Sequence, residues 1–405
     1  MMLFEQKSDC CGCTACATVC PCGAITMKAD DEGFAYPEIN NELCVECGRC
    51  RAACQIHSLQ EKKTIDPIVY AAKHANEDTR AKSTSGGMFS AFADKILADN
   101  GVIYGVAYDE NFTARHERAE SAEQYRRFRG SKYVQSELGD CFARVKEDAE
   151  SGRSVLFVGT PCQIGGLKTY LGDLAEADNL LLCEIICHGA PSPKLWKEHI
   201  ALLESERQSK VVDYKNRSKV LGWHGHNEHI FFENGKEEYD SKLSNLHKDL
   251  FYAHLTIRPS CYTCRYTGFP RYADITIADF WGIENFMPDF DDNKGISMLI
   301  LNTPKAVAFY NTIKDSLICR ESTVEQAFFD NHKRPAKINV NRENFWRDYH
   351  QNGYRFVARK YADYTTIGRI KRKTKIVVKA LSKRLGIYRF IHQITLRKYQ
   401  KETYK

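Results

Sequence analysis

The chain has 405 residues with 58 Lys/Arg, 52 Asp/Glu and 17 cysteines, and this length predicts two to three domains. Residues 359–405 hold fifteen basic and two acidic side chains, so residues 1–358 carry a net charge of −7. The basic excess therefore belongs to a tail, and no recognised nucleic-acid-binding module accompanies it. No stretch approaches the ~18 apolar residues of a membrane-spanning helix, which predicts a soluble protein.

Two identical cysteine runs dominate the first 54 residues. In each run, gaps of two, two and three residues separate four cysteines, and the second run follows the first by 34 residues. This is the bacterial ferredoxin spacing, in which the fourth cysteine of each run binds the other cluster. We therefore assign one 4Fe-4S cluster to Cys10, Cys13, Cys16 and Cys54, and a second to Cys44, Cys47, Cys50 and Cys20.

Disulfides and structural zinc are the alternatives for these cysteines. Disulfides need an oxidising compartment, and residues 1–9 contain no apolar export signal. Zinc sites usually pair two C-x2-C units across a spacer, which is a poor match to two complete four-cysteine runs. Pro21 follows the first run whereas Gln55 follows the second, a departure that removes no ligand. The sequence predicts an electron carrier in a reducing compartment, most simply the cytoplasm.

Residues 1–60 are predicted to form an α+β, ferredoxin-like unit. After a polar linker, short apolar runs alternate with helical patterns, which predicts an α/β domain with a mixed, largely parallel sheet. We divide this region into residues 67–150 and 151–350. Asn234-Gly235 predicts a β-hairpin near residues 228–239 with a type I′ turn. The predicted strands are 68–73, 102–108, 155–159, 180–186, 275–278 and 298–301.

Four cysteines beyond the first 60 residues lie at positions typical of metal ligands. Cys162 and Cys187 directly follow predicted strands, where open α/β sheets place their sites, and Cys261 with Cys264 forms a C-x2-C pair. Four thiolates on loops can hold a third 4Fe-4S cluster. Alternatively, Cys162 and Cys187 are ordinary buried cysteines, and spacing alone does not decide. We interpret the other cysteines as packing residues, namely Cys11, Cys22, Cys141, Cys183 and Cys319.

A serine- and glycine-rich segment, residues 83–87, precedes an amphipathic helical pattern over 88–97. Glycines permit close backbone approach and a helix N-terminus favours a pyrophosphate, although a serine-capped helix after a flexible loop is the alternative. Lys132 in residues 130–136 is either a phosphate partner or solvated surface. No G-x-G-x-x-G fingerprint is present, so a Rossmann-type NAD(P)H site is not supported.

Five motifs resemble those of the beta subunits of coenzyme F-420-reducing hydrogenases and dehydrogenases, and they occur in the order found in that family. The resemblance covers about residues 5–350. The motifs are Ser-Thr-Ser-Gly-Gly (83–87), Gly-Ser-Lys-Tyr-Val-Gln-Ser (130–136), Gly-Thr-Pro-Cys-Gln (159–163), Cys-His-Gly (187–189) and Ala-Asp-Ile with Asp-Phe-Trp-Gly (273–282). Plant 7-hydroxymethyl chlorophyll a reductase is similar in its catalytic part. Members of the family carry FAD and 4Fe-4S clusters.

The resemblance implies that Cys162, Cys187, Cys261 and Cys264 hold the third cluster. It also implies an FAD site, for which we predict the residues Ser83, Ser85, Gly86, Gly87, Ser131, Lys132, Tyr133, Gly159, Thr160 and Pro161. At Asp279 the sequence departs from the Gly-Asp that the family often has. Asp279 either contacts the ligands from outside the cluster or is itself an alternative ligand. His188 either transfers a proton as a catalytic residue or, in the interpretation that we favour, hydrogen-bonds the loop backbone.

The predicted function is an iron–sulfur flavoprotein oxidoreductase. It would pass electrons between the ferredoxin-type clusters and FAD, with coenzyme F-420 or another organic substrate as hydride or electron partner and a ferredoxin or other redox subunit as protein partner. The alternative is a non-catalytic electron-transfer subunit that exchanges electrons with a partner redox enzyme. The basic amphipathic tail, residues 359–405, is either a solvated helix or a peripheral contact with the inner face of a membrane.

Overall fold

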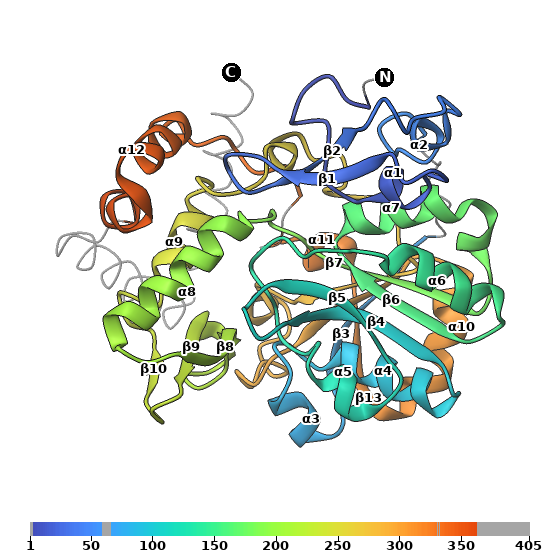
Figure 1. The fold of residues 1–405 in the computed structure, drawn as a ribbon. Coiled ribbons are helices and arrows are strands. Elements are labelled where there is room, and N and C mark those ends of the chain that lie inside the picture. Colours follow the sequence, from blue (N-terminus) through green and yellow to red (C-terminus); the bar gives the residue numbers. More distant parts are fainter. Residues whose placement is uncertain (1–2, 59–65, 330, 332, 363–405) are drawn as a thin grey trace, which may run out of the picture.

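An eight-stranded sheet forms the centre of the computed structural model, which describes residues 3–58, 66–329, 331 and 333–362 (Figure 1). Its strand order is β13-β3-β12-β11-β7-β6-β4-β5. The strands are β3 (Ile68–His74), β4 (Val102–Tyr108), β5 (Ala114–Ala119), β6 (Val155–Gly159), β7 (Leu180–Ile185), β11 (Ile275–Asp279), β12 (Ser297–Leu301) and β13 (Leu317–Ser322). All six strands predicted from apolar runs belong to this sheet.

The sheet is mixed, as predicted, but only its centre is parallel. Strands β4, β6, β7 and β11 pair in parallel, whereas the four pairings toward the two edges are antiparallel. The expectation of a largely parallel sheet therefore holds for the central four strands alone. The edge strands β5 and β13 were not predicted, because charged side chains interrupt their apolar residues, as is common at sheet edges.

Alternate residues of the central strands face two different helix layers. In β6, Val155 and Phe157 pack in the core formed with α6 (Cys141–Glu150) and α7 (Pro161–Leu171). Leu156 packs on the opposite face, in the core formed with α4 (Met88–Ala98) and α10 (Pro304–Ile313). Because both faces are buried, these strands are continuous apolar runs, the pattern that made them recognisable in the sequence.

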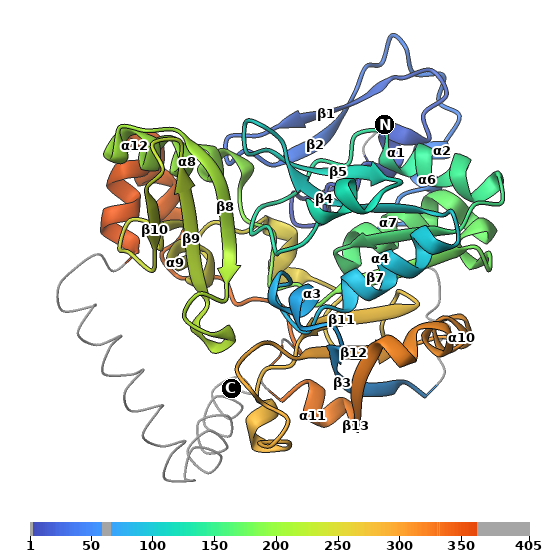
Figure 2. The ribbon, with the colours of Figure 1, turned by 90° about the horizontal axis from the view of Figure 1, so that it is seen from below.

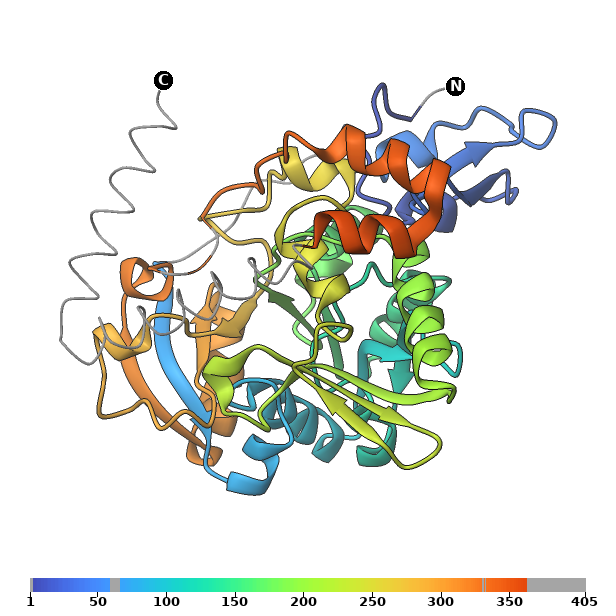
Figure 3. The same ribbon diagram turned by 90° about the vertical axis from the view of Figure 1, so that its left-hand side faces the viewer.

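A second, smaller lobe lies beside the main sheet (Figures 1 and 2). It contains an antiparallel sheet of β8 (Val211–Ser218), β9 (Asn227–Phe232) and β10 (Glu237–Tyr239). The helices α8 (Pro193–Arg207), α9 (Leu246–Tyr252) and α12 (Arg342–Tyr361) cover this sheet, and their core also includes Ala114 of β5 and the preceding Phe112. Gly353 leaves helical geometry inside α12, and Figure 3 shows its two halves running in different directions.

The hairpin between β9 and β10 confirms the predicted turn position but not the turn type. Gly235 has φ +78°, whereas Asn234 is not in the positive-φ region that a type I′ turn requires at both central residues. The N–H of Phe232 donates to the Lys236 carbonyl, which closes a longer loop than two residues. A glycine in the left-handed region of a longer hairpin loop therefore replaces the predicted two-residue turn.

The N-terminal unit lies against both lobes. It consists of α1 (Ala15–Thr18), an antiparallel pair of β1 (Ile25–Ala29) and β2 (Ala35–Ile39), and α2 (Arg49–Ala52). Helix α1 contacts α6 and α7, and Arg342 of α12 forms an ion pair with Glu32 in the β1–β2 turn. The cysteine loops of this unit therefore pack against the edge of the main sheet where its central parallel strands end.

The remaining helices are the short segments α3 (Glu77–Ala81), α5 (Ala122–Arg126) and α11 (Val324–Ala327). Among the described residues, none of the helices combines the length and the apolar character needed to cross a lipid bilayer. The predicted amphipathic tail falls outside the described residues from position 363 onward. Helix α12 includes only the first residues of that tail.

The ion pair between Arg80 and Asp292 offers a test of how the fold is held together. Arg80 is fully buried and both of its terminal nitrogens donate to Asp292, so Asp292→Asn should lower the free energy of unfolding by about 1–3 kcal/mol. Desolvation opposes ionisation of Asp292, but the bonds from Arg80 hold its pKa at about 2. The difference between the two proteins should therefore be present above pH ~4 and shrink as the pH falls toward 2.

Urea unfolding followed by tryptophan fluorescence measures this difference. Asp289→Asn is the matched control, because its partner Arg320 is exposed and such surface pairs contribute about 0–1 kcal/mol. Equal effects of the two substitutions would contradict the role assigned to Arg80.

Candidate functional site

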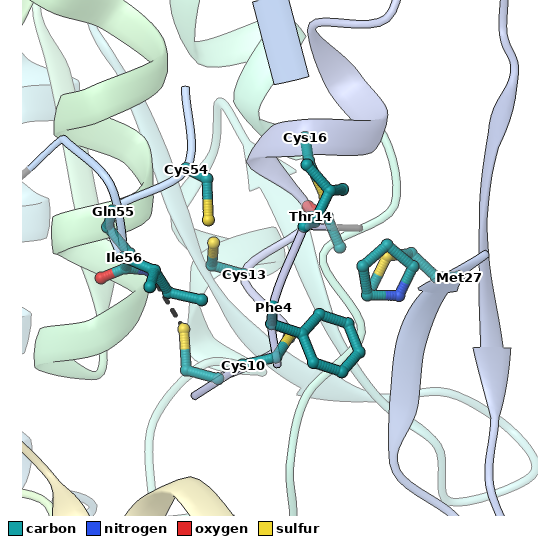
Figure 4. A pocket seen from close by; sticks show the side chains of 13 residues that line it. Phe4, Cys10, Cys13, Thr14, Cys16, Met27, Cys54, Gln55 and Ile56 are labelled. Carbon is teal, nitrogen blue, oxygen red and sulfur yellow. Dashed lines mark hydrogen bonds between the residues drawn. The ribbon is translucent and has the colours of Figure 1, made fainter. Parts of the chain in front are cut away.

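Two small cavities in the N-terminal unit are each lined by four of the predicted cysteines. The inner cavity is lined by Cys10, Cys13, Cys16 and Cys54 (Figure 4). The outer cavity is lined by Cys20, Cys44, Cys47 and Cys50. Each cavity thus takes three cysteines from one run and the fourth from the other. The structure brings together the same two sets that the spacing predicted.

The spread of these sulfur atoms discriminates between a cluster and a single ion. A zinc ion holds its thiolates at about 2.3 Å, so any two of them are at most ~4.6 Å apart. Within the part of the chain that the structure describes, no three cysteine sulfurs lie within 4.8 Å of one another. The donor set is therefore too open for one zinc ion and fits a larger polynuclear group, whose thiolates sit on separate iron atoms.

The two cavities differ in their surroundings. Apolar side chains enclose the inner cavity, and Figure 4 shows Phe4 and Met27 on one side of its cysteines and Gln55 on the other. The outer cavity lies at the surface, because Cys47 is exposed and the neighbouring Val45 is 67% exposed. The inner cavity is thus shielded by the rest of the chain, and the outer one faces solvent.

A third group of cysteines lies at the carboxyl ends of the main sheet. Cys162 is in the first turn of α7, Cys187 follows β7, and Cys261 and Cys264 lie at the short 3-10 turn η3 (Pro259–Thr263). Burial raises the pKa of Cys187, and Cys261, Cys162 and Cys264 raise it further. Burial likewise raises the pKa of Cys261 to about 12. The four thiols are therefore close enough to repel one another as thiolates, and a shared cationic group would relieve that repulsion.

The inner cavity and this third group are in direct contact. The amide Nε2 of Gln55 donates both to Cys11 Sγ at 3.0 Å and to the Cys162 carbonyl at 2.9 Å. A Cβ atom at Gly166 of α7 would lie only 2.7 Å from Cys13 Sγ. Cys11 and Gln55 therefore join two cysteine sets that are more than 100 residues apart in the sequence.

A basic cleft of about 1110 Å³ separates the main sheet from the small lobe. Ten of its 24 lining residues are Lys or Arg and three are acidic, although residues 1–358 are net negative. The basic residues are Arg80, Lys82, Arg126, Arg127, Arg129, Lys132, Lys215, Arg217, Lys219 and Lys294. Such a concentration of positive charge favours an anionic ligand.

Two features show that the positive charges of the cleft are not all balanced by acceptors or anions of the protein. The Nε atom of Arg129 is buried and has no hydrogen-bond partner among the described residues. Burial, followed by the charge of Arg80, lowers the pKa of Lys219 to about 8. A phosphate or pyrophosphate in the cleft would supply both an acceptor and the missing negative charge.

The predicted flavin residues divide into those that line this cleft and those that do not. Ser83, Ser131 and Lys132 line it, together with Thr84 and Gly130 of the same two motifs. The other predicted residues are not part of its lining, namely Ser85, Gly86, Gly87, Tyr133, Gly159, Thr160 and Pro161. Those assignments stay predictions.

Two residues of the predicted set have structural partners of their own. A Cβ atom at Gly86 would meet the Ala72 carbonyl oxygen at 2.3 Å, so this glycine permits close packing on β3. Lys132 donates to three backbone carbonyls, those of residues 127, 128 and 129, at 3.0 Å each. An ammonium group has three donors, so Lys132 caps the end of α5 and has no donor left for a phosphate in this conformation.

Histidine 188 lies near the third cysteine group but does not line the cleft. Its Nε2 atom is 2.9 Å from Nε2 of His254, so one of the two nitrogens donates and the other accepts. The rings of His188 and Phe251 also pack edge to face, with their centroids 5.1 Å apart. The backbone contact that the sequence favoured for His188 stays a prediction beside this bond to a second histidine.

Asp279 is not directed at the cysteines. Its carboxylate accepts from Arg217 at 2.9 Å and from Trp223 Nε1 at 2.6 Å. Arg217 also lines the basic cleft. Asp279 thus orients a cleft cation, and we find no contact that supports it as an alternative ligand among the described residues.

The remaining cysteines also have defined places. Cys141 and Cys183 are buried in the cores of the main sheet, as expected of packing residues, and the partly buried Cys319 packs against one of these cores. Cys22, by contrast, is exposed at the outer cavity, with its Sγ 3.7 Å from that of Cys20. Cys11 connects the inner cavity to the third group, a role that its position beside Cys10 did not reveal.

Comparison with known proteins identifies two regions of the chain. Residues 9–57 match the family described as a 4Fe-4S dicluster domain, and residues 152–327 match the family described as the C terminus of the coenzyme F420 hydrogenase/dehydrogenase beta subunit. The chain thus carries a 4Fe-4S dicluster domain, and residues 152–327 are similar to these beta subunits. The resemblance to the coenzyme F-420 hydrogenase and dehydrogenase beta subunits is confirmed.

Two individual proteins are similar to parts of this chain. The F subunit of the F(420)H(2) dehydrogenase of Methanosarcina mazei is 28% identical over 174 residues, which are 39% of this chain. The match spans 47%, about half, of that relative's length. A chain of the F420-reducing NiFe hydrogenase complex from Methanosarcina barkeri is 15% identical with a TM-score of 0.43, covering 64% of this chain and 82% of that chain.

The contact between Gly166 and Cys13 can be tested directly. Gly166 lies inside α7, where alanine is the better helix former, so Gly166→Ala should not weaken the helix itself. Its new methyl group would nevertheless overlap Cys13, and we expect it to displace the first cysteine loop and to lower the iron content of the purified protein. Iron analysis after anaerobic purification measures the effect.

Asp173→Ala just after the same helix is the control, because Asp173 is exposed and its truncation adds no atom near the cysteine loops. Full iron content in Gly166→Ala would mean that the first cysteine loop does not depend on this contact.

Proposed function

We propose that this chain is an iron–sulfur flavoprotein oxidoreductase that passes electrons between ferredoxin-type 4Fe-4S sites and FAD. The observation that carries the proposal is the continuous series of sites from the surface inward. The outer cavity, the inner cavity and the third cysteine group follow one another, and Gln55 bonds across the last boundary. Electron transfer needs such closely spaced carriers, which a structural role would not require.

The outer cavity is suited to exchange electrons with a protein partner. Cys47 is exposed, and the apolar side chains of Leu43 and Val45 beside it are 51% and 67% exposed. Exposed apolar residues around a redox site favour a transient protein contact. We infer that a ferredoxin or another redox protein docks here.

The third cysteine group is suited to hand electrons toward the cleft. Cys162, Cys187, Cys261 and Cys264 would hold a third 4Fe-4S cluster. Next to Cys187, the rings of His188, Phe251 and Tyr133 pack in sequence, with centroids 5.1 and 5.4 Å apart. Tyr133 in turn lies beside Arg217, a cleft residue. These packed rings exclude water between the cysteines and the cleft.

The cleft is suited to bind FAD or an anionic organic substrate. FAD, when bound, converts single electrons into an electron pair or a hydride. Arg129 would bind a phosphate group through its buried Nε, and Lys219 has one donor left for it beside its bonds to the carbonyls of Arg80 and Ser85. The paired His188 and His254 would hold one proton between their Nε2 atoms. Coenzyme F-420 or another organic molecule is the proposed substrate.

Cofactor content of anaerobically purified protein tests this proposal. We expect about twelve iron atoms, four for each of three clusters, and one FAD per chain. About eight iron atoms without flavin would instead support a non-catalytic electron-transfer subunit. Cys162→Ser and Cys264→Ser should each lower the iron content toward eight, whereas Cys319→Ser, far from the cysteine groups, should not. Unchanged iron in the first two variants would rule out the third cluster.

Flavin affinity tests the cleft separately. Arg129→Met removes the buried donor, and we expect FAD to bind flavin-depleted protein at least tenfold more weakly, which is ~1.4 kcal/mol. Quenching of flavin fluorescence on titration measures the affinity. Arg126→Met is the control, since Arg126 lies exposed at the cleft edge where its charge is screened. Equal affinity in wild type and Arg129→Met would exclude this cleft as the FAD site.

A further inference from the structure

One arginine of the small lobe's connecting segment reaches into the N-terminal unit. Arg258 precedes the Cys261–Cys264 pair, and only 1% of its surface is exposed. Its Nε donates to the Cys10 carbonyl at 2.8 Å, and its Nη2 lies 3.7 Å from Cys10 Sγ. The guanidinium also stacks over the ring of Tyr36 at 4.2 Å. A cation is thus buried directly beside a predicted ligand of the inner cavity.

The hydrogen-bond partners of this buried cation, as far as the structure describes the chain, are all uncharged or sulfur. Its other hydrogen bonds go to neutral acceptors, the Ala35 carbonyl at 2.9 Å and Gln135 Oε1 at 3.1 Å. Among the described residues, no carboxylate forms an ion pair with Arg258. Burying an unpaired charge is costly, so the negative charge that offsets it must come from the thiolates and the group that they hold.

Arg258 also makes the two halves of the cysteine repeat unequal. The repeat places Cys44 where the first run has Cys10, so the two cavities have the same ligand pattern. Arg258 lies outside the repeat, and none of its hydrogen bonds reaches the outer cavity. The outer cavity is moreover exposed, where solvent screens neighbouring charges. Glu46, which lines the outer cavity, is screened in this way, whereas Arg258 is a desolvated charge beside the inner cavity.

We propose that Arg258 raises the reduction potential of the inner site above that of the outer site, so that an electron entering at the surface moves inward. Reduction adds one negative charge to an iron–sulfur site, and a desolvated cation nearby stabilises the reduced form. The electron comes from a one-electron donor protein, which is oxidised, and no covalent bond forms or breaks. The inference rests on the ferredoxin-type sites of the proposed function and not on FAD.

Redox titration of the full chain, followed by electron paramagnetic resonance, tests the role of Arg258. In wild type we expect two distinct potentials for the N-terminal sites. In Arg258→Met the higher one should fall so that the ratio of reduced to oxidised site drops at least tenfold at a fixed potential, which is ~59 mV for a one-electron couple. The lower potential should not move. Arg258→Lys keeps the charge and should shift the potential less.

A second variant neutralises the charge without removing the arginine. Gln135→Glu places a carboxylate 3.1 Å from the guanidinium at almost unchanged volume, and it should lower the same potential. Gln135→Met is its control, because the amide also donates to the Cys11 carbonyl and this variant loses that bond without adding charge. If Arg258→Met loses iron, Gln135→Glu tests the role of the arginine instead. The control for arginine removal is Arg342→Met, which removes a partly buried arginine of the same interface, bonded to Glu32 instead of a cysteine. Both potentials should stay as in wild type.

Two unchanged potentials in iron-replete Gln135→Glu would overturn the inference, as would equal shifts of both potentials. These outcomes are independent of the flavin proposal, because iron and FAD content are measured on the same samples. Protein with eight iron atoms, no FAD and a shifted inner potential would refute the proposed function and leave the role of Arg258 standing.

Discussion

Helix α7 carries two consecutive glycines, Gly165 and Gly166, and both face the N-terminal cysteine loops. A Cβ atom at either position would overlap a neighbour, at Gly165 the Tyr266 hydroxyl at 2.5 Å and at Gly166 the Cβ of Cys13 at 2.6 Å. The same helix begins at Pro161 and carries Cys162 in its first turn. Backbone without side chains thus lets two sulfur-rich sites approach each other, and the other interface contacts depend on that approach.

The interface around these glycines is polar and buried, and the donors of Gln55 and Arg258 are satisfied although Gln55 Oε1 has no partner among the described residues. Gln55 is 5% exposed and Arg258 1%, yet their donors reach backbone carbonyls or sulfur atoms across the interface. Buried polar groups of this kind are costly unless each finds a partner, so they fix one orientation of the N-terminal unit. Arg342 and Glu32 add an ion pair at the opposite edge. Relative movement of the unit would break these bonds together.

The features predicted best from the sequence are those that a residue type alone indicates. The cysteine sets followed from spacing, and the six central strands from apolar runs, because burial on both faces leaves no polar alternation. The edge strands carry no such signal. The cleft could not be predicted because its cations come from four distant segments, 77–84, 126–132, 213–220 and 293–294, and each resembles ordinary surface in the sequence. Arg258 was missed for a similar reason, since a single buried arginine has no periodicity and resembles a solvated one in the sequence.

The two walls of the basic cleft belong to different hydrophobic cores. Arg129 follows α5 on the main sheet, whereas Lys219 follows β8 of the small lobe. A ligand that bridges the walls links two lobes that already share a packed seam, in which Tyr108 of β4 stacks on Trp196 of α8. Its binding energy then adds to the coupling that this seam provides, so occupancy of the cleft raises the temperature at which the lobes unfold together.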